Sequence, residues 1–428
     1  MQLYKTSVTS LQKLVISSKY RKDKKEEKSI INPQKVPEKD KFSNFNQSSN
    51  HVVHGARRSR HKVIINVDHF GAKADGQTDD TQVPVPPARG RDEAPAQSID
   101  GSPSCRDGAR HFHGRAGHAP VSQIKGTIRA FSELHEDTDR FWIKFQNLRN
   151  FQVQGGGIVD GNGEIWWKNS CKIKKTLAMT FEHCTNLKVT NLHIQNSQQM
   201  HLIFQNCVGV NASYLNVTAP GTSPNTDGIH ITKTQNIEIT TSEIKTGDDC
   251  ISIVNGSKNI RITNIVCGPG HGISIGSLGE NHLEHHVSNV LVDGATLSST
   301  KNGVRIKTWQ GGSGYARNIT FQNIEMHNVF NPIIINQNYC DKLDESCKEQ
   351  KSAVQVMDVV YNNIRGTSAS EVAIKLECSD TVPCRGIVLE NINLSRQGEG
   401  EAEANCSNII GLISLGTPVS PSCPNFGN

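Results

Sequence analysis

Three polar side chains recur at one interval in the middle of this chain. Asp227, Asp249 and His271 follow one another at spacings of 22 and 22 residues, and each lies two residues before an isoleucine that opens a β-branched run. Equal spacing in an equal context predicts a repeating coil, whose successive turns lie about 4.8 Å apart as neighbouring strands do. The three side chains should therefore lie on adjacent turns, with Asp248 beside Asp249.

Carboxyl groups held this close change each other's chemistry. Each negative charge raises the proton affinity of its neighbours, so one group can stay protonated while another is ionised. Such groups can serve as general acid and general base in the hydrolysis of a glycosidic bond. Arg305 and Lys307 alternate with apolar residues and should point outward onto the same face. The alternative for any single aspartate is structural, a side chain that only caps backbone groups at a corner.

The elements that position these residues form a repeat. Apolar or small residues recur at relative positions 0, 2, 5 and 7, with a repeat length of mostly 21–30 residues. Positions 0 and 2 are the inward face of a strand, and the step to position 5 marks a corner. The repeats are Phe151/Val153/Gly156/Ile158, Leu187/Val189/Leu192/Ile194, Val208/Val210/Ser213/Leu215, Ile237/Ile239/Ser242/Ile244, Ile260/Ile262/Ile265/Cys267, Val290/Val292/Ala295/Leu297, Ile319/Phe321/Ile324/Met326, Val359/Tyr361/Ile364/Gly366 and Ile387/Leu389/Ile392/Leu394.

This pattern predicts the fold. With a further apolar run between the repeats, there are about three short strands per turn, which indicates an all-β, right-handed parallel β-helix solenoid. No segment keeps a 3.6-residue period over about ten residues, which excludes a helical repeat. Asparagine, which tolerates the left-handed conformation, marks five of the corners. These asparagines are Asn191, Asn264, Asn323, Asn363 and Asn391.

The chain divides unevenly. Residues 63–428 are expected to form a single β-helix catalytic domain that begins with a strand at 63–67. Residues 1–62 are rich in Lys, Ser and Asn and are predicted to be disordered or mis-assigned. Residues 84–120 hold five arginines, no lysine and few large apolar residues, so we expect them to be unstructured.

Composition limits the class of partner. A net charge of +5 gives no strongly basic surface of the kind that binds nucleic acid. No stretch approaches the roughly 18–20 apolar residues of a membrane helix. The chain is therefore expected to be a monomer that binds neither nucleic acid nor a membrane.

The cysteines favour an oxidising compartment. None of the twelve forms a C-x-x-C pair, which favours disulfides over zinc binding. Close pairs are Cys250/Cys267, Cys340/Cys347, Cys378/Cys384 and Cys406/Cys423, while the pairing of Cys171, Cys184 and Cys207 is left open. Glycosylation sequons, which agree with secretion, lie at Asn46, Asn211, Asn216, Asn255, Asn318, Asn393 and Asn405. The first 30 residues lack the apolar core of a secretory signal, so we expect the N-terminus to be mis-assigned.

At its central motifs the chain resembles the plant polygalacturonases of glycoside hydrolase family 28. The similarity covers about residues 64–80 and about residue 123 to the C-terminus. The matching motifs are Ser223–His230 (SPNTDGIH), Gly247–Cys250 (GDDC), Cys267–Ile273 (CGPGHGI), Arg305–Lys307 (RIK), Trp309–Gly314 (WQGGSG) and Asn336–Cys340 (NQNYC).

The resemblance implies a function and a site. The expected reaction is hydrolysis of α-1,4 links in de-esterified pectin with inversion and endo action, in the cell wall, without metal or cofactor. Asp249 would be the general acid, and Asp227 and Asp248 would hold and deprotonate water. His271 would keep Asp249 suitably protonated or orient the sugar. The substrate, through its galacturonate carboxylate and nearby groups, would be bound by Arg305, Lys307, Tyr339 and Asn225.

Two other functions stay open. A pectate lyase on a similar β-helix would need Ca²⁺ and a basic residue that abstracts a proton. A folded but inactive pectin-binding protein is also possible, because residues 81–123 depart from the family's N-terminal cap. His282–His286 (HLEHH) is not H-E-x-x-H, so no metal site is expected there. Gly311–Gly314 lacks the Lys-Ser/Thr of a phosphate-binding loop and is expected to border the cleft.

Overall fold

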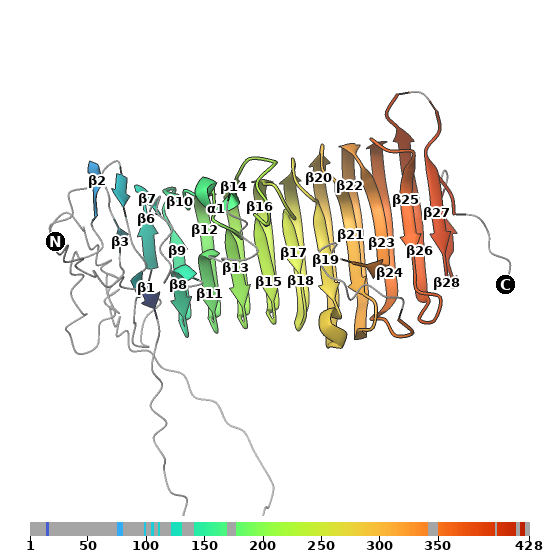
Figure 1. The fold of residues 1–428 in the computed structure, drawn as a ribbon, viewed down its shortest axis with the longest axis horizontal. Coiled ribbons are helices and arrows are strands. Elements are labelled where there is room, and N and C mark those ends of the chain that lie inside the picture. Colours follow the sequence, from blue (N-terminus) through green and yellow to red (C-terminus); the bar gives the residue numbers. More distant parts are fainter. Residues whose placement is uncertain are drawn as a thin grey trace, which may run out of the picture. The chain divides into compact units, whose positions relative to one another are not determined.

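The computed structural model describes residues 121–130, 141–168, 177–340, 350–398, 400–416 and 420–423, and the backbone of five short strands nearer the N-terminus. They belong to one compact unit, Met1–Ser18 with Val63–Asn428, which is a solenoid of parallel strands. In Figure 1 the turns from β8 (Phe141–Gln146) to β27 (Glu403–Ser407) follow one another along the axis in sequence order, whereas β1 (Leu14–Ile16) lies beside β8. The predicted all-β, right-handed parallel β-helix is confirmed.

Sheet A is the first of two long parallel sheets, and each turn of the solenoid adds one strand to it. Its polar residues lie between buried apolar ones, as in Ile229–Thr232, where the two isoleucines are buried. The strands are β8 (Phe141–Gln146), β11 (Leu177–Glu182), β13 (Leu202–Gln205), β15 (Ile229–Thr232), β17 (Ile251–Ile253), β19 (Ile273–Leu278), β21 (Asn302–Trp309), β23 (Asn331–Tyr339), β25 (Val372–Glu377) and β27 (Glu403–Ser407).

Sheet B is bent, and most of its strands are longer. They are β6 (Val121–Ile124), β7 (Thr127–Arg129), β9 (Arg149–Gln154), β10 (Ile158–Asp160), β12 (Thr185–Gln195), β14 (Val208–Thr218), β16 (Gln235–Lys245), β18 (Ser257–Cys267), β20 (Glu284–Ser298), β22 (Ser313–Val329), β24 (Gln355–Ser368), β26 (Cys384–Arg396), β28 (Ile409–Ile410) and β29 (Ile413–Leu415). Two strands, not the expected three, make up most turns, because pairing between neighbouring turns continues on both sides of the corner.

The five predicted asparagine corners are confirmed. Asn191, Asn264, Asn323, Asn363 and Asn391 have φ between 51° and 55°. A second line of asparagines in the left-handed conformation lies in the first part of successive sheet B strands. Their side-chain amides bond from turn to turn, with donor–acceptor distances of 2.8–3.1 Å. That line is Asn236, Asn259, Asn289 and Asn318, the last of which is one of the sequons.

The predicted register is right for most repeats and wrong for two. In β14 the buried positions are Val210, Ala212, Leu215 and Val217, two residues later than predicted, and Val208 is 42% exposed. Because side chains alternate with a period of two, a shift by two residues fits the same strand pattern. In the first repeat the core residue after the corner is Val159 and not Ile158, since the corner there holds an additional residue.

The N-terminal predictions stay predictions. Five short strands are described by their backbone alone: β1 (Leu14–Ile16), β2 (Asp75–Asp79), β3 (Ser98–Ile99), β4 (Ser104–Arg106) and β5 (Arg110–His111). The last three lie inside residues 84–120, and the rest of that segment lies outside the described residues. The predicted strand at 63–67 and most of residues 1–62 also lie outside them.

Helices contribute little to the described part of the chain. Helix α1 (Glu164–Lys168) follows β10, and the 3₁₀ turn η2 (Glu280–His282) follows β19. Among the described residues, no helix has the length and hydropathy that crossing a membrane requires.

Aromatic side chains stack in the core. Phe145, Phe181 and Phe204 follow one another at centroid distances of 4.7 and 5.6 Å, and Phe321 stacks on Tyr361 at 5.4 Å. The Tyr361 hydroxyl is buried and has no hydrogen-bond partner among the described residues. Burial accordingly raises the pKa of Tyr361 far above its usual range.

Tyr361→Phe should therefore leave the fold at least as stable. Removing an unsatisfied buried hydroxyl is expected to raise the free energy of unfolding by about 1 kcal/mol or leave it unchanged. The matched control Phe321→Tyr adds a hydroxyl to the stacking partner and should cost about 1–3 kcal/mol. Urea unfolding at neutral pH measures both, and a clear loss of stability in Tyr361→Phe would mean that the hydroxyl has a partner.

Candidate active site

The equal spacing of the central polar residues becomes one register across three strands. Ile229 of β15 pairs with Ile251 of β17, which pairs with Ile273 of β19. Asp227, Asp249 and His271, each two residues before one of these isoleucines, therefore lie on adjacent turns as predicted. The neighbouring strand β21 brings Arg305 and Lys307 to the same face.

Asp249 is the most enclosed of the acidic groups, with its side chain 3% exposed. Its Oδ1 accepts hydrogen bonds from Ser274 Oγ at 2.7 Å and from an Arg305 guanidinium nitrogen at 2.8 Å. Its Oδ2 accepts one from Lys307 Nζ at 3.1 Å. Burial alone would raise the pKa of Asp249, but the two cations and the Ser274 hydroxyl outweigh it and lower the pKa to about 2.

Asp227 lies in the opposite electrostatic situation. Its Oδ2 accepts a hydrogen bond from Ser252 Oγ at 2.7 Å, and His230 Nδ1 lies 3.9 Å from the same oxygen. Burial, followed by the negative charge of Asp248, raises the pKa of Asp227 above its usual value. At mildly acidic pH Asp227 thus holds a proton more readily than Asp249.

Asp248 is the carboxyl group that pairs with His271. His271 Nδ1 lies 2.9 Å from Asp248 Oδ1, an oxygen that also accepts the Asp249 backbone N–H at 2.8 Å. The imidazole is therefore bonded to Asp248, whereas the resemblance had linked His271 to the protonation of Asp249 or to the orientation of the sugar. The lowered pKa of Asp249 favours its ionised form, and the catalytic roles of the three carboxyl groups stay predictions.

Two histidines that the sequence analysis missed support Asp227. The buried His201 donates twice to the Asp227 carbonyl oxygen, from its backbone N–H at 2.9 Å and from Nδ1 at 3.0 Å. Its Nε2 lies 3.3 Å from both the Ser197 backbone nitrogen and the Thr218 carbonyl oxygen, and in the Nδ1–H tautomer it accepts the Ser197 N–H. No sequence pattern marks His201, because it is a single residue in a turn. His230, by contrast, lies between two core isoleucines, as Ser252 does on the next turn. This alternation in the sequence could have predicted that the His230 side chain points outward beside Asp227.

The predicted substrate-binding residues surround the cations. Lys307 Nζ lies 5.5 Å from the centre of the Tyr339 ring, and that ring meets Trp309 edge-on at 5.2 Å. These contacts bring Tyr339 next to the acidic cluster. Asn225 lies in the connection before β15, two residues from Asp227, in the left-handed conformation with φ of 55°.

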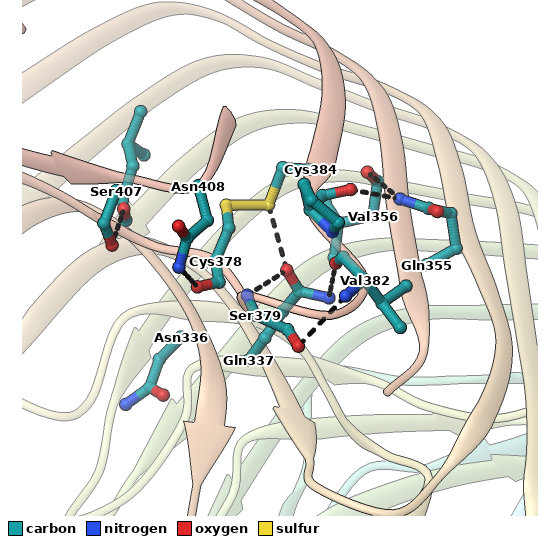
Figure 2. Close-up of a disulfide and its surroundings, with 12 residues drawn as sticks. Asn336, Gln337, Gln355, Val356, Cys378, Ser379, Val382, Cys384, Ser407 and Asn408 are labelled. Carbon is teal, nitrogen blue, oxygen red and sulfur yellow. Dashed lines mark hydrogen bonds between the residues drawn. A yellow bond between two sulfur atoms is a disulfide. The ribbon is translucent and has the colours of Figure 1, made fainter. Parts of the chain in front are cut away.

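The strand that carries Tyr339 is anchored by a buried glutamine (Figure 2). Gln337 Nε2 donates to the Val354 and Val382 carbonyls at 2.9 and 3.3 Å, and its Oε1 accepts the Ser379 backbone N–H at 3.0 Å. Figure 2 shows the Gln337 amide directed into the loop closed by the Cys378–Cys384 disulfide, while Asn336 points away from it. The loop thus fixes β23 from the side opposite its outward residues.

Three of the close cysteine pairs form disulfides in the described part of the chain. They are Cys250–Cys267, Cys378–Cys384 and Cys406–Cys423, with Cα–Cα distances of 6.0, 5.6 and 5.7 Å. Cys340 is also disulfide-bonded, and Cys347 lies outside the described residues. Cys184 and Cys207, whose pairing was left open, are buried free thiols, and Cys171 lies outside the described residues.

One group could in principle hold a metal ion. Asp248, Asp249 and His271 each offer a ligand atom within 4.8 Å of the others. Both Asp249 oxygens already accept hydrogen bonds from cations, so a divalent ion would have to displace Lys307 or Arg305. In the HLEHH motif, His282 Nδ1 lies within hydrogen-bond distance of the Gly311 carbonyl oxygen, and His285 Nδ1 accepts the Gly279 backbone N–H.

His201 should make the fold sensitive to acid. Burial lowers its pKa to about 4, against an ordinary value near 6.5, so the unfolded chain binds this proton first as pH falls. The contribution of neutral His201 to the free energy of unfolding is fully present above about pH 6.5 and is lost as pH falls towards 4. Between pH 7 and 4.5 the loss from this residue should be about 2–3 kcal/mol.

His201→Gln should remove that loss, although it lowers stability at pH 7. Urea unfolding of the wild type and the variant at both pH values isolates the contribution, because Asp227 and the other groups are common to both. An equal acid-induced loss in the two proteins would contradict the assignment.

Comparisons with known proteins identify the family. The family model for glycosyl hydrolases family 28 matches residues 111–420. A polygalacturonase from Malus domestica is 54% identical over 353 residues, which are 80% of this chain and 76% of that protein. Polygalacturonase QRT2 from Arabidopsis thaliana is 51% identical over 372 residues, 84% of each chain.

Solved structures support the fold. The endo-xylogalacturonan hydrolase from Aspergillus tubingensis superposes with a TM-score of 0.68 at 19% identity, covering 84% of this chain and all of that one. An exopolygalacturonase from Thermotoga maritima gives a TM-score of 0.60 at 18% identity, covering 83% and 92%. At these identities the likeness concerns the fold alone. The family match and the close relatives establish that the chain belongs to glycoside hydrolase family 28.

Proposed function

We propose that this protein is a polygalacturonase that hydrolyses α-1,4-galacturonosyl links of de-esterified pectin. The relatives named above carry that activity in their names. The observation that carries the proposal is the site itself: three carboxyl groups in three different environments, next to two cations that can bind an acidic sugar.

Asp248 is proposed as the general acid. Its side chain is 17% exposed, against 10% for Asp227 and 3% for Asp249, so it is the most accessible of the three to a glycosidic oxygen. Among the described residues, the hydrogen bonds to the Asp248 carboxyl group come from the Asp249 backbone N–H and His271 and reach Oδ1, so Oδ2 is the oxygen available to the substrate. His271, 31% exposed, can return a proton to Asp248 from solvent after each turnover.

Asp249 and Asp227 are proposed to hold the attacking water. Its two cations keep Asp249 ionised at mildly acidic pH, so it can accept a hydrogen bond from the water, while Asp227, whose pKa is raised, binds the proton that the water loses more readily. A water between two carboxyl groups on neighbouring turns supports direct displacement and therefore inversion. Oxygens of Asp248 and Asp249 come within 4.8 Å, closer than the roughly 6.5–9.5 Å common between carboxyl groups of inverting hydrolases. Proton NMR of the first-formed anomer is therefore the direct measure of stereochemistry.

Arg305 and Lys307 are proposed to bind the substrate carboxylate while they hold Asp249. Arg305 uses Nε for Ser274 and one terminal nitrogen for Asp249, which leaves its other terminal nitrogen for an anion. Lys307 has three donors and gives one to Asp249. Tyr339 and Asn225 are proposed as further contacts with the sugar.

Endo action is proposed from the shape of the rim. The loop Gly311–Gly314 packs closely against the preceding turn: a Cβ on Gly312 would lie 2.5 Å from Gly279, and one on Gly314 2.1 Å from the His285 carbonyl oxygen. We propose that this packing keeps the loop from closing over the substrate. We also propose that the enzyme acts as a monomer in the cell wall, an oxidising location in keeping with its disulfides.

The direct test is hydrolysis of polygalacturonate by the purified full-length chain. The expected result is release of reducing ends with an early fall in viscosity, unchanged by EDTA, because Arg305 and Lys307 supply the positive charge. Unsaturated, ultraviolet-absorbing products that disappear with chelator would instead identify a lyase. Binding of oligogalacturonate by a folded protein without hydrolysis would identify the inactive pectin-binding protein.

The roles of the two consecutive aspartates can be separated chemically. Asp248→Asn and Asp249→Asn should each lower kcat by at least about 100-fold on polygalacturonate, the range of general acid and base catalysis. Asp248→Asn should recover on an aryl galacturonide with an activated leaving group, which needs no acid. Asp249→Asn should recover with azide, which needs no base. The reverse pattern of rescue would return the acid role to Asp249.

A further inference from the structure

A row of four side chains crosses the site at one register position. His230 pairs with Ser252, Ser252 with Ser274, and Ser274 with Arg305, on four consecutive turns of sheet A. Each of these residues lies between two buried apolar neighbours, so all four side chains point outward.

The two halves of this row serve the two buried aspartates in the same way. Ser274 Oγ donates to Asp249 at 2.7 Å and receives Arg305 Nε at 3.1 Å. Ser252 Oγ donates to Asp227 at 2.7 Å and lies 2.8 Å from His230 Nδ1. Arginine is always protonated, so the first half fixes Asp249 as an anion. Histidine exchanges protons near neutral pH, so the second half can change the charge of Asp227.

The hydrogen positions follow from the donor count. When Asp227 is ionised, the single Ser252 hydroxyl hydrogen points to the carboxylate, so His230 Nδ1 must carry a hydrogen and donate it to Ser252 Oγ. When Asp227 is protonated, the same two bonds can run the other way, from Asp227 to Ser252 and from Ser252 to His230. Both arrangements satisfy every group.

We propose that His230 and Ser252 form a proton relay that carries the proton of Asp227 to solvent after each turnover. The proposal rests on the hydrolytic function proposed above, in which Asp227 and Asp249 hold the attacking water. Asp227 gives its proton to Ser252 Oγ, while the Ser252 hydroxyl proton passes to His230 Nδ1. His230 Nε2 then releases a proton to solvent, which leaves a neutral imidazole and an ionised Asp227. No bond other than O–H and N–H changes, and no electron is transferred.

The surroundings give the relay a reason. Asp227 is buried, with its side chain 10% exposed, and faces His230, Asp248 and Asp249, so while substrate covers the site a proton on it exchanges poorly with bulk solvent. His230 is part-buried, with its side chain 16% exposed, and connects that interior position to the surface. On the Asp249 side the same place is taken by Arg305, which cannot carry a proton away.

The relay predicts a particular pattern of kinetics. His230→Gln and Ser252→Ala should each lower kcat about 10-fold with little change in KM and should alter the pH profile of kcat. The double variant should be no slower than either single variant, because the two residues act as one unit. If the wild type hydrolyses polygalacturonate and the single variants keep its kcat and pH profile, or their losses multiply, the relay is wrong.

A second measurement does not depend on activity. The ¹⁵N shifts of the His230 ring should show two inflections with pH, one from its own titration and one from that of Asp227. The second inflection should disappear in Asp227→Asn and also in Ser252→Ala, because the hydroxyl transmits it. Its persistence in Ser252→Ala would reduce the coupling to charge alone and overturn the relay, even if the wild type proved inactive and the hydrolytic proposal failed.

Discussion

Pairing of each turn with the next in one fixed register is the constraint on which the site depends. A residue at a given position lies about 4.8 Å from its equivalents on the turns before and after. The row His230, Ser252, Ser274 and Arg305 and the pair Asp227 and Asp249 are consequences of that rule. Inserting one residue within a turn would shift that turn's side chains away from the equivalent positions on the neighbouring turns.

The same constraint makes the site electrostatically costly. It buries two carboxyl groups side by side, which would raise the proton affinity of both if nothing compensated. The chain compensates unequally: Asp249 receives two cations and a hydroxyl, whereas Asp227 receives a hydroxyl and a titratable imidazole. Equal positions in the fold thus acquire different charges, and acid–base chemistry requires such a difference.

The turn and the face that many of the site residues occupy were predictable, because the repeat length can be read from the sequence. The spacing of 22 residues placed Asp227, Asp249 and His271 on adjacent turns, and alternation placed Arg305 and Lys307 outward. Partners within the site were harder to predict. Asp248 and Asp249 are consecutive in a turn, where backbone dihedrals and not periodicity decide which one faces His271.

Other failures have equally definite causes. The pattern with period two cannot distinguish Val208 from Val210, so one turn was placed two residues early. His201 is a single residue whose importance comes from two bonds to one carbonyl, which no spacing encodes. Ser252 was visible in the same row as Ser274, but a hydroxyl on the outer face of a strand has no distinctive pattern until its carboxylate partner is located.

The central claim is that one register gives Asp227 and Asp249 opposite protonation behaviour. The most direct measurement is a ¹³C NMR titration of the aspartate carboxyl carbons, assigned by single Asp→Asn variants. Asp249 should titrate near pH 2 and Asp227 above the ordinary value for an aspartate, so that an interval of pH exists in which one is ionised and the other protonated. Titration of both groups together near the ordinary value would contradict the account.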